Sequence, residues 1–163
     1  MEIRNFNSDC KNEYNELLEL FKMYCDELYI NDPSAKMNDD MKIEFFEWIL
    51  KDCDYDDGWI LIAIDTETDE ITGFVFAHID RQEKGWCAKE GWGCIREVYV
   101  SPIFRKKGIG EKLIKVCEEK MKAFEPKGYY LTSDGNDSFW GKLGYCFEGE
   151  IESLNNTRVF AKR

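Results

Sequence analysis

The chain has 163 residues and a net charge of −11 at pH 7, from 33 acidic and 22 basic residues. This acidic balance argues against nucleic acid or an anionic membrane surface as a partner, because both repel negative charge. An apolar content of 44% argues against disorder, and no apolar run is long enough to cross a bilayer. We expect one domain over residues 1–163.

The first third of the chain predicts a strand followed by two helices. Residues 2–7 alternate loosely between polar and apolar side chains, as a short strand does. Apolar residues then recur at helical spacing over 14–28, which predicts an amphipathic helix with Ser8 or Asp9 as its cap. After a loop that contains Asp-Pro, a second helix is expected. It begins near Met41, and its predicted buried face consists of Met41, Phe45, Trp48 and Ile49.

The middle of the chain predicts three strands. The apolar runs 59–64 and 71–79 are joined by a short polar turn and predict a β-hairpin. A long polar loop covers 80–91. Residues 94–100, with the sequence CIREVYV, then predict the third strand of this part.

The last third predicts two helices and three strands. Apolar residues that step by four over 109–121 predict a helix, and residues 129–133 predict the next strand. Asp137 can cap a short helix. Residues 145–163 predict a final hairpin with its turn at 154–156. The order of elements indicates an α+β fold with α/β-type layering, in which helices flank a single mixed, mostly antiparallel sheet of about six or seven strands.

The cysteines favour a reducing environment. There are seven of them, an odd number, with no Cys-x-x-Cys pair and only one histidine in the chain. These features argue against a disulfide framework and against a zinc site, so no metal is expected. The N-terminal residues also lack the apolar stretch of a secretory signal. We therefore expect reduced, mostly buried thiols in a cytoplasmic protein.

A basic turn with two glycines stands out in this acidic chain. The segment VSPIFRKKGIG (100–110) places Arg105, Lys106 and Lys107 directly before Gly-x-Gly at a helix start. The first amides of a helix lack internal partners, and glycine lets an anion approach them closely. The turn therefore suits a diphosphate, although it could instead be a simple corner with solvated cations. It is neither a P-loop nor a dinucleotide fingerprint, whose third glycine is replaced here by Leu113.

Two motifs together resemble those of a known family. Arg-x-x-Gly-x-Gly at 105–110, preceded by an apolar strand and a Pro-containing turn, resembles the acetyl-coenzyme A signature of GNAT-superfamily N-acetyltransferases. Asn136 and the segment FWGKLGYCFEGE (139–150) are similar to a second family motif. The resemblance implies an acetyl-CoA-dependent N-acetyltransferase that acts on a primary amine by direct attack in a ternary complex. A small-molecule amine, polyamine-like or aminoglycoside-like, is favoured over a protein as the acceptor.

The resemblance also implies which residues bind the cofactor. The diphosphate is expected on the basic turn. The pantetheine arm is expected beside the strand that precedes it, in a cleft between this strand and the next one. The cofactor-binding residues carried over from the family are Val98, Tyr99, Val100, Arg105, Lys106, Lys107, Gly108, Ile109, Gly110 and Asn136.

Two groups on the cleft strand are expected to take part in the chemistry. An alkylammonium must lose a proton before it attacks a thioester, and Glu97 is the candidate general base. Glu97 could instead be an ordinary strand residue that faces solvent or pairs with Arg96 or a lysine. Alternation places Ile95, Glu97 and Tyr99 on one face of the strand. The backbone N–H of Val98 is the expected oxyanion donor.

Trp140 departs from the family's pattern. Many relatives carry a tyrosine at this position that is thought to protonate the departing thiolate, and an indole cannot serve as a general acid. The role of acid is therefore unassigned, with Ser138 and Tyr145 nearby in sequence. Trp140 is expected to pack against the coenzyme arm or the core. Loss of the tyrosine leaves an alternative from another class, a non-catalytic acyl-CoA-binding sensor module.

The acceptor is defined less well than the cofactor. Trp86 and Trp92, in the long loop, could cover a cationic substrate or anchor the loop. The resemblance also allows a homodimer, because dimers are common in the family and the C-terminal hairpin offers an edge. Acidic loop residues could attract an amine or simply be solvated. They are Asp32, Asp39, Asp40, Asp54, Asp56 and Asp57.

Overall fold

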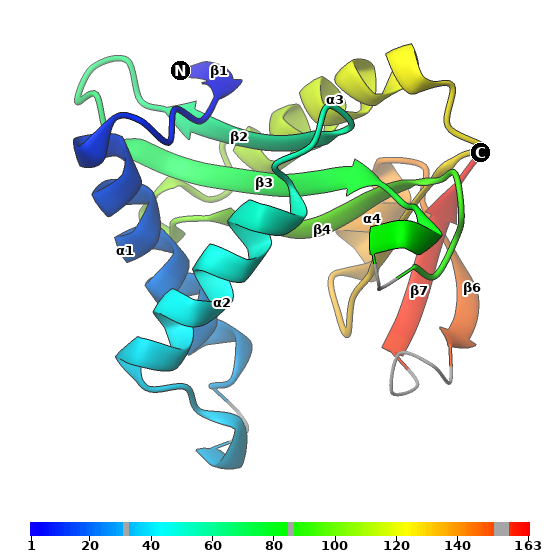
Figure 1. The fold of residues 1–163 in the computed structure, drawn as a ribbon, viewed down its shortest axis with the longest axis horizontal. Helices are drawn as coiled ribbons and strands as arrows, with labels where there is room; N and C mark the ends of the chain where they lie inside the picture. Colours follow the sequence, from blue (N-terminus) through cyan, green and yellow to red (C-terminus); the bar gives the residue numbers. More distant parts are fainter. Residues whose placement is uncertain (31–32, 85–86, 152–156) are drawn as a thin grey trace.

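The computed structural model describes residues 1–30, 33–84, 87–151 and 157–163 and contains one β-sheet with helices on both faces (Figure 1). The order of the strands described is β1-β2-β3-β4-β5-β7-β6, and all neighbours are antiparallel except β4 and β5. The expected mixed, mostly antiparallel sheet is confirmed. The strands are β1 (Glu2–Asn5), β2 (Gly58–Ile64), β3 (Ile71–Ile79), β4 (Gly93–Val100), β5 (Tyr129–Thr132), β6 (Cys146–Ile151) and β7 (Thr157–Lys162).

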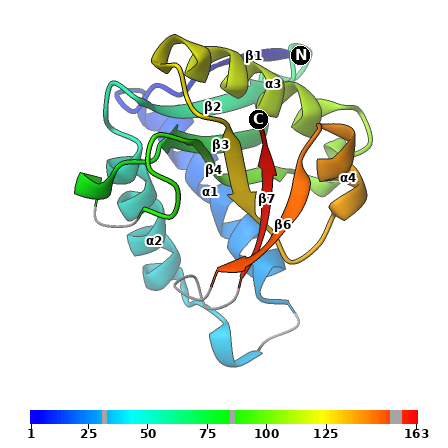
Figure 2. The ribbon, with the colours of Figure 1, turned by 90° about the vertical axis from the view of Figure 1, so that its right-hand side faces the viewer.

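The helices divide between the two faces of the sheet. Helices α1 (Lys11–Leu28) and α2 (Asp39–Asp52) lie on one face of β1–β4, and α3 (Ile109–Met121) lies on the other, as both views show (Figures 1 and 2). The short α4 (Asp137–Lys142) contributes to the same core as α3. The expected order of strands and helices along the chain is therefore observed. The turn expected at 154–156 lies outside the described residues.

Each face of the sheet has its own apolar core. On the α1 and α2 face, Phe21 and Phe46 pack against Phe76 of β3. On the opposite face, the core joins Leu113 of α3 to Val75 of β3. Both faces of β3 are covered, which is why its nine residues are all buried and read as one continuous apolar run.

Two details of the first helices differ from expectation. Cys10 rather than Ser8 or Asp9 precedes α1, and no side chain caps this helix. In α2 the buried residues are Lys42, Phe46 and Ile49, whereas Met41 and Trp48 are 47% and 48% exposed. The predicted buried face is confirmed for Ile49 and in part for Phe45, and it is wrong for Met41 and Trp48, because contact with α1 and β3 decides which side of α2 is buried.

Candidate active site

The strand β4 is paired along one edge and largely open along the other. Its antiparallel register with β3 extends from Gly93 to Val100. Its parallel register with β5 covers only Gly93–Ile95 opposite Tyr129–Leu131. A pocket of about 190 Å³ lies where the two strands separate, at the place where the family resemblance implies a cleft. It is lined by Cys94, Ile95, Arg96, Glu97, Tyr130 and Thr132.

The backbone N–H groups of Val98 and Val100 point toward this open edge. Ser101 N donates a hydrogen bond to Thr72 O, on the β3 side, at 2.9 Å. Successive residues of a strand direct their backbone groups to opposite edges, so the groups of Val98 and Val100 face away from β3. The Val100 carbonyl shows this orientation directly, because it accepts a hydrogen bond from Arg105 Nε at 2.9 Å. The open edge therefore offers main-chain partners to an extended ligand.

A β-bulge in β4 sets which side chains face the helices. The register against β3 shifts between Ile95 and Glu97, which leaves Arg96 as the extra residue. Ile95 consequently lies in the core on the α3 face, whereas Glu97 points to α1. The expectation that Ile95, Glu97 and Tyr99 share one face is wrong for Ile95, because simple alternation does not continue through a bulge.

Glu97 is half-buried between the pocket and α1. Its side chain lines the pocket, and its carboxylate accepts a hydrogen bond from the Tyr24 hydroxyl. Burial raises the pKa of Glu97 to about 7, while the Tyr24 hydrogen bond and the charge of Arg96 oppose this rise. A carboxyl group with such a pKa exchanges protons readily at neutral pH, which is what a general base needs.

Arg96 is held mainly on the α2 side of Glu97. Its guanidinium lies 3.4 Å from Asp52 of α2 and 4.6 Å from the centre of the Trp48 ring. Its positive charge still favours the ionised form of Glu97. Arg96 thus helps to define the α2 wall of the pocket, whose lining it joins.

The turn between β4 and α3 presents a set of free backbone amides. Lys106 and Gly108 both have left-handed φ angles, of 63° and 76°, with Lys107 between them. Within the described part of the chain, no group accepts a hydrogen bond from the amides of residues 106–110. A Cβ at Gly108 would have nothing within 4 Å, so the turn is open on that side. Such a concave group of N–H donors at a helix N-terminus fits a diphosphate.

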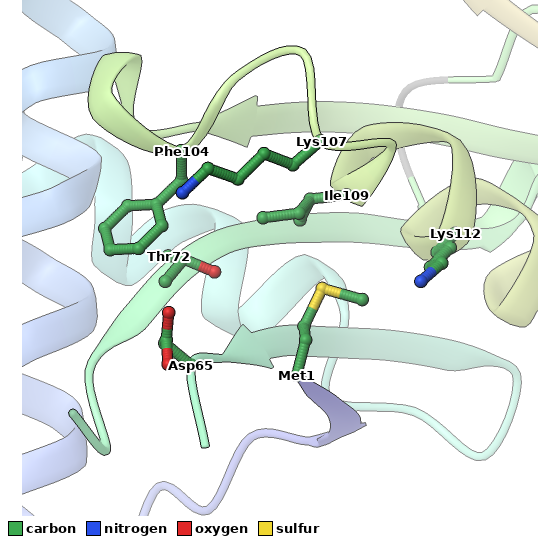
Figure 3. Close-up of a pocket in the computed structure, with 7 residues that line it drawn as sticks. All are labelled: Met1, Asp65, Thr72, Phe104, Lys107, Ile109 and Lys112. Atoms are coloured by element: carbon green, nitrogen blue, oxygen red, sulfur yellow. The ribbon is translucent and has the colours of Figure 1, made fainter. Parts of the chain in front are cut away.

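Two of the three cations of this turn face protein groups. Arg105 pairs with Glu27 of α1 at 2.7 Å, and its guanidinium lies 5.2 Å from the ring centre of Tyr99. Lys107 runs back over Phe104, with its ammonium 4.9 Å from the ring centre (Figure 3). Lys107 and Phe104 there line a second pocket of about 130 Å³. The remaining lining residues are Met1, Asp65, Thr72, Ile109 and Lys112.

The second sequence motif forms the start of α4. Asn136 is exposed, has a left-handed φ of 62°, and accepts backbone hydrogen bonds from Phe139 and Trp140. Trp140 is 5% exposed and packs in the core, and its Nε1 has no hydrogen-bond partner among the described residues. Tyr145 is also buried and donates to Glu118 at 2.8 Å. The Tyr145 hydroxyl is therefore occupied by a structural contact.

Comparison with known proteins identifies the family. The sequence matches the acetyltransferase (GNAT) family over residues 17–145. The chain belongs to this family. No curated protein matches the sequence.

Solved structures show that the GNAT fold extends over nearly the whole chain. PaiA N-acetyltransferase from Thermoplasma acidophilum, crystallised with coenzyme A, is 17% identical, with a TM-score of 0.73 over 99% of this chain and 98% of that chain. Aminoglycoside 6′-acetyltransferase type Ii is 23% identical, with a TM-score of 0.71 over 99% and 96%. An aminoglycoside 6′-N-acetyltransferase complexed with coenzyme A is 19% identical, with a TM-score of 0.71 over 99% and 96%. At these identities the likeness establishes the fold.

The acidic residues near α2 of this GNAT protein are partly neutralised. Asp39 lies 3.6 Å from Lys42, and Asp57 lies 3.1 Å from Arg81. Asp40, Asp54 and Asp56 are exposed, and Asp32 lies outside the described residues. The acidic loops therefore carry less free charge than the sequence suggests.

Of the two loop tryptophans considered for substrate binding, the structure describes Trp92. Trp92 is half-buried, with the Lys89 ammonium 4.6 Å from its ring centre, and it packs on a small core of β4, β5 and β7, which favours a role as loop anchor. Trp86 lies outside the described residues. No helix in the described part of the chain is long and apolar enough to cross a membrane.

Tyr24 is a site residue that the sequence did not reveal. Helical periodicity places it with the buried face of α1, and it is 73 residues away from its partner Glu97. No spacing rule links two positions so far apart. The sequence carried no signal for this contact.

Proposed function

We propose that this GNAT protein is an acetyl-CoA-dependent N-acetyltransferase that acetylates a small-molecule primary amine by direct attack in a ternary complex. Residues 1–163 would act as one domain. The observation that carries the proposal is the open edge of β4, which leads directly into the free amides of the glycine turn. Bound acetyl-CoA would supply an activated thioester.

The coenzyme is proposed to bind mainly through the protein backbone. The amides of Lys106, Lys107, Gly108, Ile109 and Gly110 would hold the diphosphate, since they are free and converge at a helix N-terminus. Arg105 adds positive charge and braces the turn through Glu27 and the Val100 carbonyl.

The pantetheine arm is proposed to lie along the open edge of β4. Val98 and Val100 face that edge with their backbone groups, and Tyr99, between them, keeps the strand attached to β3. Asn136, at the start of α4, would contact the arm from the other side of the cleft. This arrangement extends the sheet by a strand-like ligand, in the manner of β-augmentation.

Glu97 and Val98 are proposed to carry the chemistry. Glu97 would accept a proton from the bound ammonium, which leaves a neutral amine able to attack. The Val98 N–H would donate a hydrogen bond to the acetyl carbonyl oxygen as negative charge develops on it. The thiol that departs has a pKa well below that of an alkylammonium, so it can leave as thiolate without an acid at position 140.

An amine acceptor is supported by charge and by the comparisons. The candidate base is a carboxylate at the pocket, in a chain of net charge −11. Two of the similar structures are aminoglycoside acetyltransferases, which favours a polyamine-like or aminoglycoside-like acceptor. All seven cysteines are free thiols, which suits the reducing cytoplasm as the place of the reaction.

A non-catalytic acyl-CoA sensor is the second candidate, and Trp140 is the observation that favours it. The indole is buried in the core and supplies no general acid. A sensor would bind the coenzyme in the same cleft without transfer.

The test is to measure acetyl-CoA binding by calorimetry and thiol release with a panel that contains a polyamine, an aminoglycoside and a lysine peptide. We expect binding, and release only when an acceptor amine is present. Binding without release for any amine would favour the sensor. Absence of binding would overturn both.

A further inference from the structure

Two hydrogen bonds between a phenol and a carboxylate join α1 to β4. The Tyr24 hydroxyl donates to Oε2 of Glu97. The Tyr99 hydroxyl donates to Oε1 of Glu27 at 2.5 Å. Tyr24 and Glu27 lie one turn apart on α1, and Glu97 and Tyr99 lie two residues apart on β4, so the two pairs form parallel links between the same surfaces. One of these links ends on the candidate base.

Several titratable or charged groups lie around Glu97, and most of them are engaged with other partners. Tyr24 and Cys25 of α1, Tyr29 directly after this helix and Arg96 of β4 lie within electrostatic reach of Glu97. The β3 residue opposite Glu97 is Phe76, which carries no charge. Of the groups that α2 contributes nearby, Asp52 faces Arg96, and Lys42 pairs with Asp26. From β5, the Tyr130 hydroxyl donates to Asp80, and Thr132 lines the pocket.

Among these described groups, Tyr24 is the one that is hydrogen-bonded to the Glu97 carboxylate. We propose that Tyr24 is a positioning residue for the base: its hydroxyl holds Oε2 of Glu97 toward α1 and leaves Oε1 for the acceptor amine. Tyr24 has this role in catalysis only if the proposed function holds. Its contact with Glu97 exists in the protein without any ligand and can be tested separately.

The hydrogen bond also acts on the charge of Glu97. Burial removes water from the carboxylate and raises its pKa, and a donated hydrogen bond lowers the pKa again because it stabilises the ionised form. Tyr24 can donate over the whole working range, since burial, and then the charge of Glu97, raise the pKa of Tyr24 well above its ordinary value. Tyr24 therefore keeps more of Glu97 ionised near neutral pH than burial alone would allow.

The experiment is a carbon-13 NMR titration of the Glu97 carboxyl in the ligand-free protein, with Glu97→Gln used to assign the signal. The variant is Tyr24→Phe, which removes the hydroxyl and keeps the ring. The matched control is Tyr14→Phe, because the Tyr14 hydroxyl on the same helix donates to Glu47 of α2 rather than to Glu97. Both variants lose one phenol–carboxylate hydrogen bond of α1.

We expect Tyr24→Phe to raise the pKa of Glu97 by about one unit and Tyr14→Phe to leave it unchanged. Since kcat/KM reports on groups of the free enzyme, its acidic limb should move to higher pH by the same amount. Activity at pH 7 should then fall about fivefold, and it should recover at higher pH. A structural role alone would lower activity equally at all pH values.

An unchanged or lowered pKa of Glu97 in Tyr24→Phe would overturn the proposal, as would an equal shift in Tyr14→Phe. A wild-type protein that transfers acetyl to no amine would refute the proposed function. In that case the titration still decides whether Tyr24 controls the ionisation of Glu97, so the two failures are distinguishable.

Discussion

The two edges of β4 differ although they belong to the same eight residues. Toward β3 the strand is paired from Gly93 to Val100, and this edge stabilises the centre of the sheet. Toward β5 the pairing stops at Ile95, and the pocket and the glycine turn follow. The edge toward β3 thus stabilises the fold, whereas the groups proposed to bind the coenzyme and to carry out the reaction lie at the edge toward β5.

The open edge results from where the neighbouring elements end. β5 has only four residues, whereas β4 has eight, so β5 cannot accompany β4 beyond its first half. β6 and β7 are turned steeply relative to β2 and β3 (Figure 1). The bulge at Arg96 lies where the two strands part, and it directs Glu97 toward α1.

The largest expected effect is on coenzyme binding at the end of the open edge. Gly108→Asp combined with Gly110→Asp should lower the affinity for acetyl-CoA at least about 1000-fold. The two carboxylates would fill the place proposed for the diphosphate, repel its negative charge and prevent its charge-assisted hydrogen bonds to the backbone amides. A Cβ at Gly110 would lie 3.4 Å from the Phe139 ring, an ordinary contact, and an Asp in the left-handed conformation of Gly108 should cost only about 1 kcal/mol, so the fold should persist. Calorimetry measures the binding, and circular dichroism provides the control. Unchanged binding would refute the phosphate site.

Proline substitutions separate the two edges directly. Val98→Pro removes an N–H that faces the open edge, so acetyl transfer should fall about 100- to 1000-fold, with only a modest loss of stability. Tyr99→Pro, one residue along, removes an N–H that faces Phe74 of β3 together with a buried ring, and should lower the free energy of unfolding by about 5 kcal/mol or more. Urea unfolding and thiol release measure the two effects. Equal destabilisation by both variants would contradict the orientation derived for Val98.

Glu97 should make the protein less stable at high pH. Its pKa is raised from 4.5 to about 7 in the folded protein, so its contribution to stability is complete below pH 4.5 and is lost as the pH rises through 7. Glu97→Gln never ionises, and it should therefore be more stable than the wild type by about 2 kcal/mol at pH 8, after allowance for partial exposure, and nearly equal to it at pH 4. Unfolding in urea at both values tests this. A difference that does not change with pH would contradict it.

The sequence predicted the elements of the site better than its contacts. Periodicity and turn residues placed the strand 94–100, the basic turn and the following helix correctly, because these signals are local. Glu97 could be proposed as the general base because it is a carboxylate on the strand that borders the cleft. The bulge at Arg96 depends on the register with β3, and alternation along one strand cannot reveal it.

Contacts between segments far apart in the chain could not be predicted from local sequence patterns. Arg105 was expected to serve the diphosphate, yet its side chain pairs with Glu27, 78 residues away. The partner of Glu97 on α1 was equally hidden. Such pairs follow from how α1 packs across the sheet, which spacing along the chain does not contain.

The smallest expected effect concerns the ion pair that connects α1 to the open edge. The side chains of Arg105 and Glu27 are 43% and 39% exposed, and a glutamine side chain can still accept the Tyr99 hydrogen bond, so Glu27→Gln should lower the free energy of unfolding by only about 0.5 kcal/mol. Arg105 keeps its hydrogen bond to the Val100 carbonyl in this variant, so the turn should retain its shape. The difference from wild type should shrink further in 1 M salt, where the Debye length is only about 3 Å. Urea unfolding with and without salt measures this. A loss above about 2 kcal/mol would mean that α1 holds the open edge of β4 more firmly than an exposed ion pair can explain.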